Sequence, residues 1–106
     1  LSWFDPPDWE EHSLRADLFD PHTVEVADFT ANGYPDLYVA EMGAESNDDP
    51  QHLLFCNTGG EFTEHVVGHG ATHEANAVDL TGNGRLDIIG KSYGPDNHVD
   101  VWYNEG

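Results

Sequence analysis

The chain contains one nine-residue loop twice. Residues 28–36 read DFTANGYPD and residues 79–87 read DLTGNGRLD, so the matching ends lie 51 residues apart (79 − 28 and 87 − 36). Each loop has oxygen-bearing side chains at its positions 1, 3, 5 and 9 and glycine at its position 6. Self-similarity at a fixed period is typical of repeat architectures, so the sequence predicts an array of one structural unit.

The loop chemistry suggests calcium. Alternate side chains of a tightly curled loop converge on one point, and oxygen ligands in that arrangement suit a hard cation such as Ca²⁺. Glycine after the third ligand lets the backbone adopt the positive φ that the curl needs. The candidate side-chain ligands are Asp28, Thr30, Asn32 and Asp36 in the first loop and Asp79, Thr81, Asn83 and Asp87 in the second.

The loop is not an EF-hand. An EF-hand needs a bidentate Glu at position 12, and that position is Val39 in one loop and Gly90 in the other. The flanking segments are rich in β-branched, aromatic and other apolar residues in short runs, which is typical of strands. The predicted unit is therefore strand, cation loop, strand.

The repeat extends beyond the loops. His22 and His73 precede them 51 residues apart, and the segments 9–14 and 62–67 both read as an aromatic residue followed by Glu, His and apolar positions. Three further stretches are apolar or aromatic and end in turn signals. They place Trp3, Phe55 and Trp102 at one repeat position, and we expect these side chains to lie in the core between neighbouring units. One period is then four short strands, as a propeller blade requires. We expect an all-β chain of two repeats, approximately 1–52 and 53–106, each with one cation loop.

These residues resemble the FG-GAP/VCBS-type repeat, which forms the blades of integrin-α-like β-propellers. The resemblance implies four-stranded antiparallel blades with calcium at the rim. It also implies that the backbone carbonyls of Tyr34 and Arg85 complete the calcium shells. The chain departs from the pattern with Thr at loop position 3 and Asn at position 5. Only two carboxylates remain per loop, and fewer charged ligands predict weaker calcium binding.

The length adds a constraint on architecture. A propeller typically has about four to eight blades, whereas 106 residues supply about two. Both ends of the chain are expected to fall inside a blade, which leaves sheet edges exposed. Either the chain is a piece of a longer protein or several copies complete a ring, and the absence of an initiator Met favours the piece.

The charge balance excludes two classes of partner. Twenty-one acidic residues face three basic ones, for a formal charge of −18, so the chain repels nucleic acid and anionic membrane surfaces. No run approaches the length of a membrane span. An acidic surface almost without lysine indicates a halophilic source, where high salt screens the self-repulsion. The alternative is an ordinary acidic extracellular domain whose bound calcium offsets part of the charge.

Histidines and tyrosines are the remaining candidates for a specific role. His65, His69 and His73 are spaced four apart, but glycine-rich surroundings argue against a helical metal face. His69 has no repeat partner and is the best single candidate among the histidines for a specific functional role. Tyr34 and Tyr93 lie in loops where they could stack on a sugar, although exposed loop tyrosines are common.

The sequence predicts a calcium-binding β-propeller segment that acts as an extracellular or cell-surface scaffold or binding module, in adhesion or glycan recognition. The expected partners are a glycan or protein ligand, together with the remaining blades or further copies of the chain. No nucleophile elbow, phosphate loop or zinc-protease motif is present. The alternative is the scaffold part of a carbohydrate-active enzyme, such as a propeller polysaccharide lyase.

Overall fold

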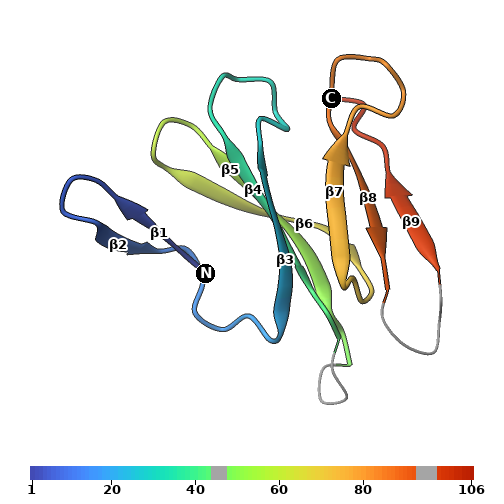
Figure 1. Cartoon of the computed structure of the whole chain (residues 1–106), viewed down its shortest axis with the longest axis horizontal. Helices are drawn as coiled ribbons and strands as arrows, with labels where there is room; N and C mark the ends of the chain where they lie inside the picture. The colour runs from blue at the N-terminus through green and yellow to red at the C-terminus, as the bar shows by residue number, and fades with distance from the viewer. Residues whose placement is uncertain (44–47, 93–97) are drawn as a thin grey trace.

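The described part of the chain is all-β. A computed structural model describes residues 1–43, 48–92 and 98–106, and these form nine antiparallel strands in three sheets with no helix (Figure 1). The described ranges therefore hold no helix that could cross a bilayer. Tyr93 lies outside the described residues.

Each sheet is a meander in which strands that follow one another in sequence are paired. The first sheet contains β1 (Ser2–Asp5) and β2 (Glu10–Ser13). The second contains β3 (Pro21–Ala27), β4 (Asp36–Glu41), β5 (Gln51–Asn57) and β6 (Phe62–His69), in that order. The third contains β7 (Glu74–Val78), β8 (Asp87–Lys91) and β9 (Val99–Trp102). The expectation of strands on both sides of each loop is confirmed.

The three sheets lie side by side in chain order, with the four-stranded sheet in the middle (Figure 1). β4 is the most buried strand, and its residues point alternately into two core clusters. One cluster contains Tyr38, Ala40 and Ile88 and lies between the second and third sheets. The other contains Val39, Leu53 and Phe55 and faces the first sheet. Both clusters therefore contain residues of β4.

The second and third sheets meet along their first strands, β3 and β7. The backbone N–H of Ala75 donates to Thr23 Oγ1 at 3.3 Å, and His22 Nδ1 lies 2.7 Å from the carbonyl oxygen of His73. The two imidazole rings lie 3.9 Å apart between centroids. The two histidines that recur at the 51-residue period therefore meet at one seam between the sheets.

The sequence period and the sheets are out of phase. The expected boundary between residues 52 and 53 lies within β5, whereas the middle sheet runs from β3 to β6. That sheet has the four antiparallel strands expected of a blade. The other two sheets have two and three strands, and the described residues form no closed barrel.

The aromatic residues that align in sequence do not all face the same way. Phe55 is buried in the cluster toward the first sheet, and Trp102 packs in the cluster between the second and third sheets. Both therefore face the preceding sheet. Trp3 instead stacks on His12 and lies 6.1 Å from Phe62 of the following sheet. Trp3 therefore lies between the first and second sheets, on the side of the following sheet.

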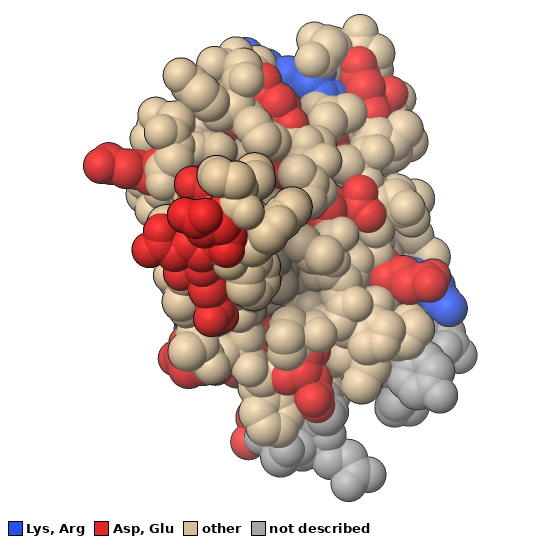
Figure 2. All heavy atoms as spheres, turned by 60° about the vertical axis from the view of Figure 1, so that its left-hand side comes forward, with Lys and Arg blue, Asp and Glu red and all other residues tan. Residues whose placement is uncertain are grey.

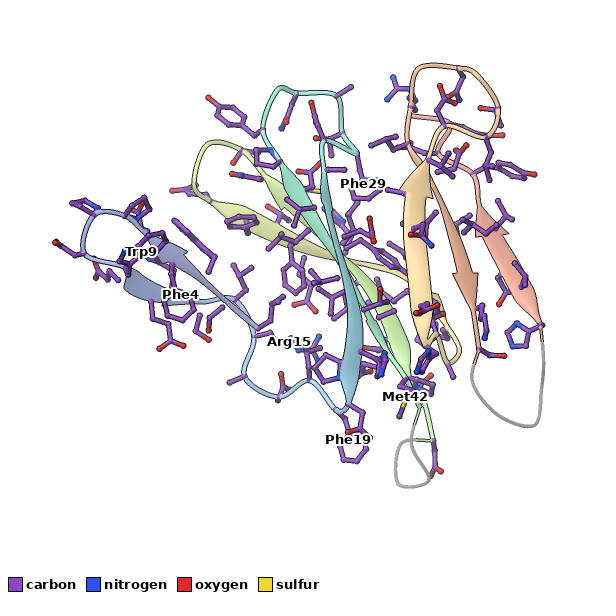
Figure 3. The ribbon with its side chains drawn as sticks, in the orientation of Figure 1. Phe4, Trp9, Arg15, Phe19, Phe29 and Met42 are labelled. Carbon is purple, nitrogen blue, oxygen red and sulfur yellow. The ribbon has the colours of Figure 1, made fainter. Side chains whose placement is uncertain are left out.

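Acidic side chains form several patches on the face shown in Figure 2, and few basic side chains lie among them. Six of the acidic residues outside the repeated loops are exposed, namely Asp8, Glu10, Asp17, Asp20, Asp48 and Asp49. Arg15 lies between the β1–β2 hairpin and the middle sheet (Figure 3), where it pairs with Asp17 and Glu64. Its hydrogen bond to Asp17 raises the pKa of Arg15 and lowers the pKa of the carboxyl group.

Candidate metal site in the repeated loops

The two candidate loops lie at the same end of their sheets (Figure 1). The first connects β3 to β4 and the second connects β7 to β8. In each, the aspartate at position 9 is also the first residue of the following strand and is fully buried. The loops are therefore anchored on the sheet at that residue, and the rest of each loop projects toward solvent.

In the first loop, Asp28 binds the backbone of the curl. Its Oδ1 accepts a hydrogen bond from the N–H of Asn32 at 3.1 Å, and its Oδ2 accepts one from Gly33 at 2.8 Å. The side chain of Asn32 then accepts the N–H of Tyr34 at 3.0 Å. Gly33 has a φ of 88°, as expected for the glycine of such a curl.

Asp36 closes the same loop from the sheet side. Its Oδ2 accepts the backbone N–H of Thr30 at 3.0 Å and the Thr30 hydroxyl at 3.1 Å. Its Oδ1 accepts the N–H of Asn57, at the end of β5, at 2.7 Å. The Thr30 hydroxyl lies 3.5 Å from Oδ1 of Asp28. Three of the predicted ligand side chains therefore come together around Thr30.

The second loop repeats the aspartate contacts. Oδ1 of Asp79 accepts the N–H groups of Gly82 and Asn83, and Oδ2 accepts that of Gly84 at 2.9 Å. The side chain of Asn83 accepts the N–H of Arg85 at 3.0 Å. The loop thus shares the backbone hydrogen bonds of the first and adds the one from Gly82.

Asp87 differs from its counterpart in the contacts of its Oδ2 atom. Its Oδ1 accepts the N–H of Asn104 at 2.8 Å, as Asp36 does from Asn57, but its Oδ2 accepts the N–H of Leu80 at 2.9 Å. Within the described ranges, the Thr81 hydroxyl makes no hydrogen bond to either aspartate of the loop. The second loop therefore brings fewer of its predicted ligands together than the first.

Two asparagines that sequence reasoning did not select complete the arrangement. Nδ2 of Asn57 donates to the carbonyl of Pro35 at 3.0 Å, while its Oδ1 accepts the N–H groups of Gly59 and Gly60. Asn104 donates to the carbonyls of Phe29 and Leu86. The repeated Asn before a glycine turn was visible in the sequence. It was interpreted only as a turn signal, because nothing local shows that the amide reaches another loop.

The candidate ligand atoms are oxygens, which suit calcium. The carboxylate oxygens among them already accept hydrogen bonds within the protein. Each of the eight carboxylate oxygens of the four aspartates accepts at least one backbone N–H. A carboxylate has about four acceptor sites, so capacity for a cation remains. Across the described ranges, no group of three His, Cys, Asp or Glu residues could hold a metal ion. A cation here would depend on hydroxyl, amide and carbonyl oxygens as much as on carboxylates.

A buried polar chain lies below the loops, in the core between the second and third sheets. Nδ1 of His52 lies 2.6 Å from the Tyr38 hydroxyl, and its Nε2 lies 3.2 Å from the Thr72 hydroxyl. All three residues are at most 1 % exposed. Burial lowers the pKa of His52 and raises that of Tyr38. Both ring nitrogens are engaged, so this network serves packing rather than ligand binding.

His69, the histidine without a repeat partner, lies at the surface. Its Nδ1 is 2.8 Å from Oδ1 of Asp49, and the side chain is 58 % exposed. Tyr34 is also exposed, on the first loop. The structure does not bring these two residues and the buried network into one site. Comparisons with protein-family models, curated proteins and solved structures found no match to this chain.

Proposed function

We propose that the chain is part of a calcium-binding β-propeller that acts as an extracellular scaffold or binding module for a glycan or protein ligand. The observation that carries the proposal is the repeated unit of antiparallel sheet and curled loop. Two such units lie beside each other with β3 against β7. A row of sheets that meet along their first strands is the arrangement from which a propeller is built.

Calcium would be held in the first loop by the side chains of Asp28, Thr30, Asn32 and Asp36 and by the carbonyl of Tyr34. The second loop would use Asp79, Thr81, Asn83, Asp87 and the carbonyl of Arg85. When bound, the ion supplies positive charge between two carboxylates that otherwise repel each other. It thereby fixes the end of one strand to the start of the next.

The two loops should differ in affinity. Thr30 lies against both aspartates of its loop, whereas Thr81 has no such contact within the described ranges. A site whose ligands are already close together loses less conformational entropy when it binds. We therefore expect the first loop to bind calcium more tightly than the second.

Isothermal titration of calcium into the purified chain tests this function. We expect two classes of site, with the tighter one lost in Asp28→Ala and the weaker one lost in Asp79→Ala. Asp8→Ala is the matched control, because Asp8 is exposed on the β1–β2 hairpin away from both loops. Absence of calcium-dependent heat at millimolar calcium, or equal losses in all three variants, would contradict the proposal.

A further inference from the structure

We propose that the pocket between the second and third sheets binds a small, planar, apolar carboxylate, with the guanidinium of Arg85 holding the carboxylate group. The pocket has a volume of about 360 Å³. Small-molecule sites usually measure roughly 300–1,000 Å³. This site goes beyond the scaffold function and requires no metal in the loops.

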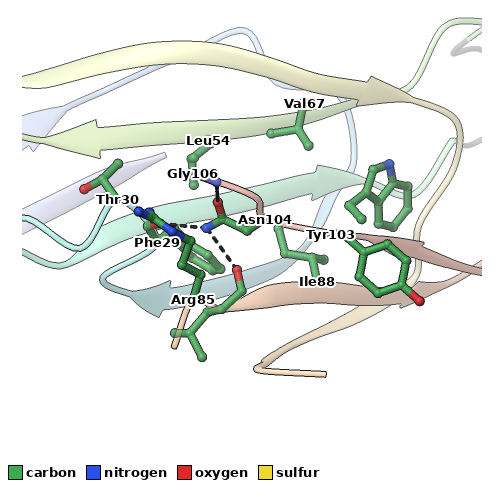
Figure 4. Close-up of a pocket in the computed structure, with 11 residues that line it drawn as sticks. Phe29, Thr30, Leu54, Val67, Arg85, Ile88, Tyr103, Asn104 and Gly106 are labelled. Carbon is green, nitrogen blue, oxygen red and sulfur yellow. Dashed lines mark hydrogen bonds between the residues drawn. The ribbon is translucent and has the colours of Figure 1, made fainter. Parts of the chain in front are cut away.

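Apolar side chains from both sheets form the walls (Figure 4). Phe29, Leu54 and Val67 line it from the second sheet and its loop. Ile88 and Trp102 line it from the third sheet. Two aromatic rings and three aliphatic side chains favour a flat, apolar ligand, because aromatic groups gain both from burial and from edge or face contact with other rings.

Arg85 gives the pocket its charge selectivity. The chain has three basic residues and twenty-one acidic ones, and Arg15 is already paired with Asp17 and Glu64. The Arg85 guanidinium, by contrast, forms no ion pair or side-chain hydrogen bond with any residue in the described ranges. An unpaired guanidinium beside an apolar wall favours a carboxylate, which it can bind through two parallel hydrogen bonds.

The equivalent space between the first and second sheets provides an internal comparison. That pocket has a volume of about 320 Å³ and is lined by residues that include Trp3, Leu37 and Phe62, with no basic side chain among them. The position that corresponds to Arg85 in the first loop is Tyr34. The two pockets are similar in size and apolar character, so the preference for an anion should belong to the Arg85 pocket alone.

The probes are 2-naphthoate and its neutral counterpart 2-naphthamide, titrated into the chain in 1 M NaCl. High salt is needed because the formal charge of −18 repels any anion at long range, and at 1 M salt the Debye length is about 3 Å. Calorimetry gives the affinities. The NMR shift of the Trp102 indole N–H reports whether the ligand enters this pocket.

We expect 2-naphthoate to bind about tenfold more tightly than 2-naphthamide and to shift the Trp102 signal. Arg85→Gln should remove the tenfold preference, about 1.4 kcal/mol, while leaving the binding of 2-naphthamide intact. Retained amide binding also shows that the variant is folded. Arg15→Gln should leave both affinities unchanged. Val67→Trp fills the pocket from an exposed strand and should weaken the binding of both ligands.

Two results would overturn the proposal. One is equal affinity for the acid and the amide, or a preference that survives Arg85→Gln. The other is the absence of any Trp102 shift at millimolar 2-naphthoate. Calcium titration of the same samples is independent of these outcomes, so failure of this site is distinguishable from failure of the calcium loops.

Discussion

At the scale of single residues, the two loops carry different residues at position 4 in a similar backbone conformation. Ala31 has a φ of 60° and its counterpart Gly82 has a φ of 72°. The left-handed region costs a residue with a Cβ about 1–2 kcal/mol, whereas glycine enters it freely. The first loop therefore holds strain that the second avoids, even though their hydrogen bonds are closely similar.

Ala31→Gly should stabilise the chain by roughly 0.5–1 kcal/mol, because relief of strain outweighs the added flexibility of the unfolded chain. Gly82→Ala should destabilise it by about 1 kcal/mol for the converse reason. Urea unfolding followed by fluorescence measures both changes. A loss of stability in Ala31→Gly would contradict the account of this loop.

The buried histidine predicts a pH dependence. Burial lowers the folded-state pKa of His52 below its ordinary value of 6.5, so the unfolded chain takes up this proton first as pH falls. The contribution of His52 is therefore fully present above pH 6.5 and is lost as pH falls below it. Tyr38, Thr72 and Trp102 surround the ring. The charge of Asp100 raises the pKa of His52 and the charge of His69 lowers it, both by less than burial does.

His52→Gln keeps an amide that can hydrogen-bond and does not titrate. The difference in unfolding free energy between wild type and this variant should shrink as pH falls from 7 to 5. Parallel pH profiles for wild type and His52→Gln would refute the assignment.

At the scale of elements, strand ends and loops are joined by side chains that reach between them. Asn57 ends β5, yet its amide and backbone bind Pro35, Asp36 and the turn that follows. Asn104 plays the same part after β9 and also reaches Phe29 across the sheet boundary. These contacts fix the loops to the sheets independently of any ion.

Removing the amide in Asn57→Ala should cost about 2 kcal/mol of stability, because it breaks the hydrogen bonds to the backbone of Pro35, Gly59 and Gly60. Asn76→Ala, at an exposed position on β7, is the matched control and should cost less than about 0.5 kcal/mol. Thermal unfolding of the two variants gives the comparison. Equal costs at the two positions would show that the Asn57 contacts contribute little.

The seam between sheets has its own test. Thr23→Val removes the hydroxyl that accepts the N–H of Ala75 and should cost about 1–2 kcal/mol with little change in volume. Thr63→Val, on the exposed face of β6, should be close to neutral. Hydrogen exchange should show faster exchange of the Ala75 amide in Thr23→Val alone. Unchanged protection at Ala75 would contradict a direct bond across the seam.

The presence of strands could be predicted from the sequence, because largely apolar runs such as 37–40 and 86–89 are short and bounded by turn residues. The loop residues were also identifiable, because position and chemistry repeat at one period. The roles of Asn57, Asn104 and His52 did not follow from the sequence, because their partners lie far along the chain. The direction of Trp3 did not follow from the sequence either, because an aromatic residue at a repeat position does not show which neighbouring sheet it contacts.

At the scale of the whole molecule, the chain is a row of three sheets rather than a closed body. The middle sheet has both faces covered, which concentrates the core around β4. The outer sheets leave large apolar residues exposed, among them Phe4 at 52 % and Val99 at 63 %. Further sheets packed against these surfaces would cover them, which is the arrangement that the proposed function requires.

The most direct test of that function is thermal unfolding at high salt, with calcium added and then with a chelator. A ligand that binds only the folded state at a hundredfold excess over Kd stabilises it by about 2.7 kcal/mol. For a domain of this size, that corresponds to a rise in Tm of roughly 10–20 °C. The account predicts such a rise, reduced in Asp28→Ala and Asp79→Ala. An unchanged Tm at millimolar calcium would mean that the loops are turns held by their own hydrogen bonds, and the calcium role would be lost.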